Sequence, residues 1–331
     1  MLDLERVKDL KSIADQVHKI RLVLINSRHP EMFLQMEAFC QDIQRELPNI
    51  EFRVKKEQLL AYPAIKITDK EEKINLYYLG LPEKREWFPF FNALKAIATG
   101  RVTLGEEDIK KARGVSVPIE VKIFITAECA FCPVVVDLAN QLAIASSMLR
   151  VFIIDGGFYP DLVKHYKVTA SPTVIINEDY FLVGTEAHEK LVPWLEKASQ
   201  KAYDSSVLKS LLKQAHAERV VELCLEKEEC IYPLLALLQD KELFSRIGAM
   251  RVLEELAEKS PRLTEKAISK IVSMLDTNET RDKGDLLFLL GLIGSPEVIS
   301  VIEKKAQEEA EEIKEIALEA IENIKKKYNY V

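Results

Sequence analysis

Two cysteines separated by two residues, Cys129 and Cys132, form the part of the sequence best suited to chemistry. A thiolate can attack a disulfide, and a second thiol about one helical turn away can then release the mixed disulfide. An apolar strand ends shortly before Cys129 and an amphipathic helix begins at Cys132, so backbone N–H groups and the helix dipole favour a thiolate there. Pro133 suits the first helical turn, which has no use for its missing N–H. The pattern predicts thiol–disulfide exchange, with Cys129 as the nucleophile and Cys132 as the resolving thiol.

The alternative use of such a pair is half of a zinc or iron–sulfur site. These sites need about four ligands, and the other cysteines, Cys40, Cys224 and Cys230, supply no second close pair. If their helix is continuous, Cys224 and Cys230 lie on different faces of it, too far apart for a disulfide, and we expect them to be core or near-surface residues. We expect Cys40 to be a small buried hydrophobe. A redox dithiol is favoured over a metal site, and an inactive pair is the third reading.

The elements around the dithiol occur twice along the chain. The pattern of apolar residues predicts strands at 120–125, 150–154, 173–176 and 181–183, with helices at 132–146, 160–166 and 189–201. The residues before this segment show a similar order of elements, with strands at 20–25, 50–54, 64–68 and 73–79 and helices at 1–18, 31–47 and 86–98. The sequence therefore predicts a duplicated α/β unit.

Beyond about Asp204 the strands disappear and every segment has helical periodicity. Gly248 and Gly284 occupy similar frames, and a more degenerate unit follows at 296–327. Repeated helical hairpins of this length predict an α-solenoid of HEAT-like repeats. The predicted organisation is α/β plus all-α. Residues 1–115 form a unit without a dithiol, 116–203 form the unit with Cys-x-x-Cys, and 204–331 form the helical repeats.

Charge and hydropathy limit the classes of partner and the compartment that we expect for this protein. The net charge is −7, and Lys and Arg are interspersed with Asp and Glu, which argues against nucleic acid. No apolar run approaches the roughly 20 residues of a membrane span, and the first residues lack the pattern of a signal peptide, so we expect a cytoplasmic protein. Abundant Glu and Lys with few Gln suggest a thermophilic source.

The segment Cys129–Pro133, which reads CAFCP, is followed about forty residues later by Ser171 and Pro172. This combination resembles the active site of the thioredoxin fold. The resemblance implies that Pro172 is cis and lies against the dithiol, and that Ser171 offers its backbone to an extended client peptide. It also makes Phe131, between the cysteines, a substrate contact.

The resemblance extends over roughly residues 15–202. Two such folds in tandem resemble the glutaredoxin-like protein disulfide oxidoreductases of thermophiles. The segment 154–158, IDGGF, and a dithiol confined to the second unit resemble the N-terminal domain of the alkyl hydroperoxide reductase flavoprotein. No Gly-x-Gly-x-x-Gly fingerprint occurs, so no cofactor beyond the redox-active disulfide is expected. Electrons must come from an external reductase, for which a thioredoxin-reductase-like flavoprotein is a candidate partner.

Two departures from the family pattern matter for function. Residues 26–30 of the first unit read NSRHP, without cysteine, although Tyr62 and Pro63 keep the look of the second proline motif. We interpret the first unit as a docking or stabilising partner. Thioredoxins also carry a buried acid six residues before the first cysteine, where this chain has Ile123, so the proton acceptor for Cys132 must lie elsewhere.

The residues next to the cysteines indicate the direction of exchange. Ala130 and Phe131 bring no positive charge between the cysteines, and Glu128 brings a negative one, which favours a reducing role on client proteins with disulfides. The helical repeats would bind a protein partner and so select the client or the electron donor. The alternative is a non-catalytic scaffold that uses the thioredoxin-like and helical surfaces for protein binding.

Overall fold

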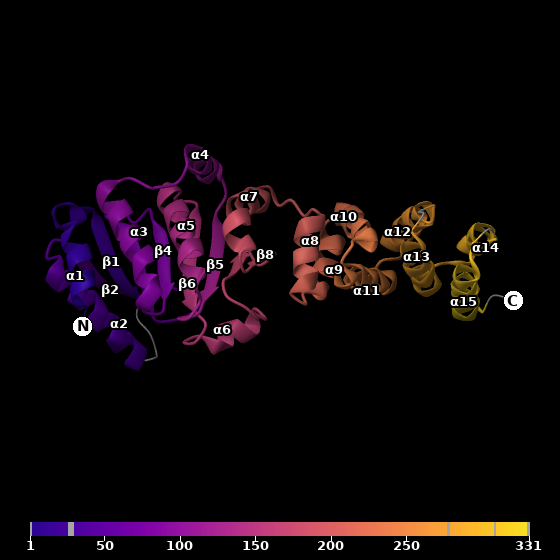
Figure 1. Ribbon diagram of the computed structural model, residues 1–331, viewed down its shortest axis with the longest axis horizontal. Helices are drawn as coiled ribbons and strands as arrows, with labels where there is room; N and C mark the ends of the chain where they lie inside the picture. The colour runs from indigo at the N-terminus through magenta and orange to yellow at the C-terminus, as the bar shows by residue number, and fades with distance from the viewer. Residues whose placement is uncertain (1, 26–29, 277–278, 308, 330–331) are drawn as a thin grey trace. The chain divides into compact units, whose positions relative to one another are not determined.

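An eight-stranded mixed β-sheet with helices forms the first part of the chain, and helices alone form the second (Figure 1). The computed structural model describes residues 2–25, 30–276, 279–307 and 309–329. Two compact units divide the chain, Met1–Ala202 and Tyr203–Val331. The first compact unit contains both α/β segments that the sequence predicts.

The sheet consists of two four-stranded halves with the same internal pairing. Its order is β2-β1-β3-β4-β6-β5-β7-β8. In each half the first strand pairs in parallel with the second and antiparallel with the third, and a parallel pair, β4 with β6, joins the halves. All eight predicted strands are confirmed, at β1 Ile20–Ile25, β2 Glu51–Lys55, β3 Ala64–Asp69, β4 Asn75–Leu79, β5 Ile119–Ile125, β6 Leu149–Asp155, β7 Thr173–Ile176 and β8 Tyr180–Val183.

Helices α3 and α5 pack side by side against this sheet (Figure 1). Their apolar residues, together with those of the central strands, form the core that holds the dithiol loop in place. The helical elements of this unit are α1 Leu4–Lys11, η1 Ala14–Lys19, α2 Pro30–Glu46, η2 Lys84–Glu86, α3 Trp87–Thr99, α4 Glu106–Gly114, α5 Cys132–Ala145, α6 Pro160–His165 and α7 Glu186–Gln200, where η denotes a 3₁₀ helix.

Two features of this unit differ from the sequence prediction. The expected helix over 1–18 is wrong, because α1 ends at Lys11 and a 3₁₀ segment follows. The Ser12 hydroxyl donates to the Asp9 carbonyl at 2.6 Å, a local bond that competes with continuation of the helix. Helix α4 was not predicted, since Ala112 is its only buried residue and no apolar stripe marks it.

The second unit contains no strand in its described residues, as the sequence predicts. The Asp204 carboxylate caps the first helix by accepting from the N–H groups of Ser206 and Val207. Its elements are α8 Ser205–Lys213, α9 Ala217–Glu226, η3 Glu228–Cys230, α10 Ile231–Ala236, η4 Leu237–Gln239, α11 Leu243–Lys259, α12 Pro261–Met274, α13 Thr280–Ile293, η5 Pro296–Val298, α14 Ile299–Ala306 and α15 Glu311–Tyr328.

The helix around Cys224 and Cys230 is not continuous. Helix α9 ends at Glu226, Lys227 is extended, and Cys230 ends the separate short helix η3. The chain therefore leaves the helix between the two cysteines, so the condition that would put them on different faces of one helix is not met. Across the described ranges, no helix is both long and apolar enough to cross a membrane.

Candidate active site

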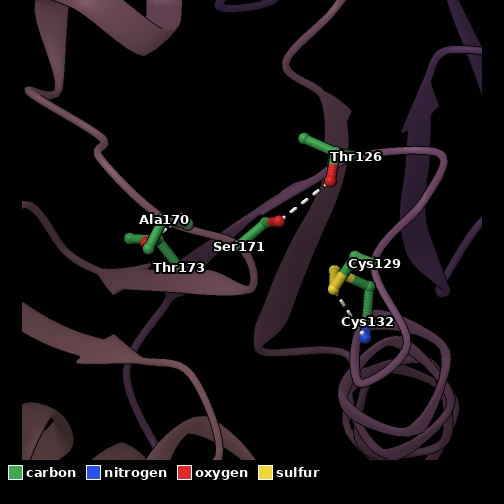
Figure 2. Close-up of a disulfide and its surroundings, with 6 residues drawn as sticks. All are labelled: Thr126, Cys129, Cys132, Ala170, Ser171 and Thr173. Carbon is green, nitrogen blue, oxygen red and sulfur yellow. Dashed lines mark hydrogen bonds between the residues drawn. A yellow bond between two sulfur atoms is a disulfide. The ribbon is translucent and has the colours of Figure 1, made fainter.

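Cys129 and Cys132 are joined by a disulfide, with their Cα atoms 5.5 Å apart (Figure 2). The loop after β5 turns at Thr126, whose carbonyl accepts the Cys129 N–H at 3.0 Å. Helix α5 begins at Cys132, and its backbone N–H donates to the Cys129 sulfur at 3.1 Å. The predicted position of the pair at a helix N-terminus is confirmed. A donor aimed at the Cys129 sulfur stabilises negative charge on that atom once the disulfide opens.

The two sulfur-bearing residues differ in access to solvent. Cys132 is fully buried, whereas Cys129 is partly exposed. Phe131, between them, is 59% exposed and so presents an apolar ring at the rim of the dithiol. An incoming protein can therefore reach Cys129 and Phe131, while Cys132 is shielded from direct attack.

The loop of Ser171 and Pro172 lies beside the dithiol loop (Figure 2). Strand β7 runs antiparallel to β5, which places the residues before β7 opposite those after β5. The hydroxyls of Thr126 and Ser171 share a hydrogen bond of 2.9 Å. The peptide bond between Ser171 and Pro172 is cis, which confirms the implication of the family resemblance, and the bond before Pro63 is cis as well.

A short helix from the first half of the sheet reaches the dithiol loop. Lys84, in η2, forms an ion pair of 2.6 Å with Glu128, the residue before Cys129. This hydrogen bond and the positive charges of Lys84 and Arg85 lower the pKa of the Glu128 carboxyl. The negative charge next to Cys129 is thus partnered, which weakens the argument from Glu128 for a reducing direction. Both side chains are largely exposed, so the pair contributes little to stability.

Glu86, also in η2, is a buried acid that the sequence did not point to. Burial and then the nearby charge of Asp155 raise the pKa of Glu86 from 4.5 to about 7. Its Oε2 atom is buried and has no hydrogen-bond partner among the described residues. Helix η2 packs against α5, the helix that begins at Cys132. No local motif could reveal Glu86, because η2 follows β4 in the first half of the sheet and meets α5 only in the folded chain.

Ile123 and the cysteines outside the dithiol are buried, apolar or protonated groups. Ile123 is fully buried in β5, so the position where thioredoxins carry an acid is apolar here. Cys40 is buried, as predicted, and burial raises its pKa. Cys224 is also buried, and burial, followed by the charge of Cys230, raises its pKa to about 12. Buried, protonated thiols are poor nucleophiles at neutral pH.

Two other predictions concern the first half and metal binding. Residues 26–29, the cysteine-free segment of the first α/β unit, lie outside the described residues. Within the described ranges, no group of three or more His, Cys, Asp or Glu side chains has an arrangement that could hold a metal ion.

A family model described as "Thioredoxin domain" matches residues 119–196. This range runs from β5 to α7 and includes the dithiol and the Ser171–Pro172 loop. The chain therefore contains a thioredoxin-like domain with a disulfide in Cys-x-x-Cys spacing.

Curated relatives match part of the chain. An alkyl hydroperoxide reductase from Pseudomonas aeruginosa is 23% identical over 130 residues, which are 39% of this chain and 25% of that protein. A protein named NADH dehydrogenase from Bacillus subtilis is 23% identical over 139 residues, 42% of this chain and 27% of that protein. The chain thus spans about a quarter of the length of these relatives.

Two solved structures share the fold of part of this chain. The N-terminal domain of alkyl hydroperoxide reductase from Enterococcus faecalis aligns with a TM-score of 0.53 and 16% identity over 59% of this chain and 100% of that structure. A protein disulfide oxidoreductase from Aeropyrum pernix aligns with a TM-score of 0.50 and 15% identity over 61% of this chain and 96% of that structure.

Proposed function

We propose that this protein is a thiol–disulfide oxidoreductase that reduces disulfides of other proteins through Cys129 and Cys132. The observation that carries the proposal is a disulfide between a partly exposed cysteine and a buried one, with the first N–H of α5 directed at the exposed sulfur. Its setting in a thioredoxin-like domain supports the same chemistry.

The exchange proceeds in two steps from the reduced dithiol. The Cys129 thiolate attacks one sulfur of the client disulfide, forms a mixed disulfide and releases the first client thiolate. The Cys132 thiolate then attacks the Cys129 sulfur, breaks the mixed disulfide and releases the second client thiolate. The client gains two electrons and the protein regains its Cys129–Cys132 disulfide. The burial of Cys132 suits this order, because the client cannot reach it first.

Client binding is assigned to the loop beside the dithiol. The backbone N–H and C=O of Ser171 make no hydrogen bond within the part of the chain that the structure describes. An extended client segment could pair with these groups, as peptides do with an open strand edge. The exposed ring of Phe131 would provide an apolar contact, and Pro172, which is buried, would hold the Ser171 backbone in place.

Glu86 is assigned as the proton acceptor for Cys132. A buried acid with a pKa near 7 can accept the thiol proton when Cys132 attacks, and the packing of η2, which contains Glu86, against α5 supports this assignment. Replacing Glu86 by Gln should lower kcat by about 10²-fold at pH 7 and leave KM unchanged. The mixed disulfide should accumulate on Cys129, as mass spectrometry after an acid quench would show. An unchanged kcat would remove Glu86 from the mechanism.

The electrons for each cycle would come from outside the chain. We assign no cofactor beyond the dithiol itself. Relatives that match part of the chain are named as an alkyl hydroperoxide reductase and an NADH dehydrogenase. On this basis, the proposed donor is a separate flavoprotein reductase that transfers electrons to the Cys129–Cys132 disulfide. The reducing direction rests on Ala130 and Phe131, which place no positive charge between the cysteines.

The rest of the chain is assigned to support and partner choice. The first half of the sheet would be a second thioredoxin-like fold without a dithiol, since its strands pair as those of the second half do. The helical unit would be a HEAT-like solenoid, supported by ion pairs between neighbouring helices, such as Arg246 with Asp285 at 2.8 Å. Its surface would select the client or the reductase.

Reduction of insulin, with dithiothreitol as the electron source, tests the function. The wild-type chain should accelerate the reaction and Cys129→Ser should not. Cys132→Ser should form a mixed disulfide with insulin that cannot resolve, visible as a mass adduct on Cys129. If Cys129→Ser retains the wild-type rate, the dithiol is not the active group, and a scaffold role becomes the better account.

A further inference from the structure

We propose that Thr126 is a positioning residue for client binding, because its hydroxyl holds the Ser171–Pro172 loop at a fixed position relative to the dithiol loop. This inference rests on the proposed function and adds a residue that sets how clients bind. It starts from the hydrogen bond of 2.9 Å between the Thr126 and Ser171 hydroxyls, drawn in Figure 2.

Each of the two loops is closed by its own hydrogen bonds. The Thr173 hydroxyl donates to the Ala170 carbonyl at 2.7 Å, and the Gly184 N–H donates to the Pro172 carbonyl at 2.8 Å. These bonds keep the Ser171–Pro172 loop attached to β7 and β8. The dithiol loop is closed separately, by the Cys129 N–H on the Thr126 carbonyl. Neither set restrains one loop against the other.

The Thr126–Ser171 bond is the only hydrogen bond between these loops among the described residues. Thr126 can act as an anchor because it follows β5 directly, and the carbonyl of Ile125 accepts the Gly156 N–H at 2.9 Å. One end of the bond is thus fixed to the central sheet, and the other end is on the loop that would receive the client.

The bond also determines which groups of Ser171 face a client. Its hydroxyl is engaged with Thr126, which leaves the backbone N–H and C=O for an extended segment. Fixing these groups before binding reduces the ordering that a client must impose on the loop. A small aromatic disulfide needs only the Cys129 sulfur and makes no use of this preorganisation. Thr126 should therefore matter for peptide disulfides and not for small ones.

The experiment compares Thr126→Val, which removes the hydroxyl at nearly constant shape, with Thr126→Ser, which keeps it. The substrates are an extended peptide with one disulfide and 5,5′-dithiobis(2-nitrobenzoic acid). For the peptide, Thr126→Val should raise KM about twofold to fivefold with little change in kcat, the lower part of the range for loss of one hydrogen bond, because this bond is exposed to solvent. Thr126→Ser should behave as wild type. The small disulfide and the reduction potential of the dithiol should not distinguish the variants.

Ser171→Ala and the double variant complete a double-mutant cycle. Because Thr126 acts through Ser171, the double variant should be no worse on the peptide than the poorer single variant. The inference fails if Thr126→Val has the same KM for the peptide as Thr126→Ser. It also fails if Thr126→Val changes the rate with the small disulfide, or the reduction potential, as much as it changes the KM for the peptide. A wild-type chain that reduces neither substrate would instead contradict the proposed function, so the two failures can be told apart.

Discussion

Burial and charge give the residues around the dithiol different properties. Cys129 is accessible and faces a backbone donor, Cys132 is buried, and Glu86 is a buried acid without a hydrogen-bond partner for Oε2 in the described chain. Burying a carboxylate without a partner is unfavourable, so Glu86 binds its proton more tightly in the folded protein than in the unfolded chain. An acid that changes protonation near neutral pH is suited to proton transfer with a thiol.

The pKa of Glu86 predicts a pH dependence of stability. Below about pH 4.5 the folded and unfolded states are both protonated, and Glu86 has no net effect. As the pH rises from there to about 7, the unfolded chain ionises first and the free energy of unfolding falls, by about 3 kcal/mol in total. Glu86→Gln should therefore stabilise the oxidised protein by a margin that grows over this window and then levels off.

Chemical denaturation of wild type and Glu86→Gln between pH 4.5 and 8 would measure this margin. The exposed acid Glu83, replaced by Gln in the same way, is the control and should show little difference at any pH. A margin for Glu86→Gln that is constant with pH would mean that its carboxyl does not titrate near 7.

At this scale, only residues that belong to local motifs could be predicted from the sequence. Cys129 and Cys132 could be predicted from their spacing before a helix, and the cis bond before Pro172 from the family resemblance. Lys84 and Glu86 could not, because the pairing of β4 with β6 brings η2, from the other half, against α5 and lets Lys84 reach the dithiol loop. The Thr126–Ser171 contact could not be predicted either, because it depends on how β5 and β7 align in the sheet.

Among the elements, the loop after β6 ties the two halves of the sheet together. Tyr159 follows β6 and is buried, and its hydroxyl donates to the Pro63 carbonyl in the first half at 2.6 Å. The cis-proline loop of the half without a dithiol is therefore in contact with a tyrosine of the other half. This contact supports the interpretation of the first half as a stabilising partner.

Tyr159→Phe should lower the free energy of unfolding of the oxidised protein by about 1–3 kcal/mol, because the Pro63 carbonyl would lose its donor inside the protein. Tyr166→Phe is the matched control. Its hydroxyl lies 3.2 Å from Glu178 in an exposed setting, so its loss should cost less than about 1 kcal/mol. Urea denaturation followed by circular dichroism would compare them. Equal losses would mean that the Tyr159 bond does not join the halves.

In the helical unit, glycines set how closely helices approach. A Cβ on Gly291, in α13, would lie 2.9 Å from the backbone of Ala320 in α15, whereas one on Gly248, in α11, would meet only the Leu212 side chain at 3.2 Å. Backbone cannot move aside as a leucine side chain can. Gly291→Ala should therefore lower the thermal midpoint of this unit by several degrees more than Gly248→Ala. Similar midpoints would indicate that α13 and α15 can separate at little cost.

Gly248 and Gly284 show how much of the helical packing could be predicted from the repeat pattern. Gly248 and Gly284 occupy similar frames in the sequence, yet Gly248 faces α8 while Gly284 faces Ile316 in α15. Helical periodicity alone predicted the helices of this unit. It could not predict which neighbouring helix each glycine would face, because that depends on packing between hairpins.

For the molecule as a whole, the division into Met1–Ala202 and Tyr203–Val331 separates the dithiol from the helical surface. If chemistry and partner choice divide in the same way, a chain ending at Ala202 should keep the dithiol couple and the reduction of small disulfides. It should lose selectivity among protein clients, measured as the ratio of kcat/KM values for two proteins. Loss of the couple itself would show that the helical unit is needed for the active site.

The most direct test is a redox titration of the full chain in buffers of defined dithiol ratio, with thiols trapped by alkylation and Cys129 and Cys132 read by mass. The account predicts one reversible two-electron couple at a low potential, in the region of the roughly −270 mV of thioredoxin. A potential near −120 mV would reverse the proposed direction. If the pair never interconverts between dithiol and disulfide, the thioredoxin-like domain is not an oxidoreductase, and the central claim is contradicted.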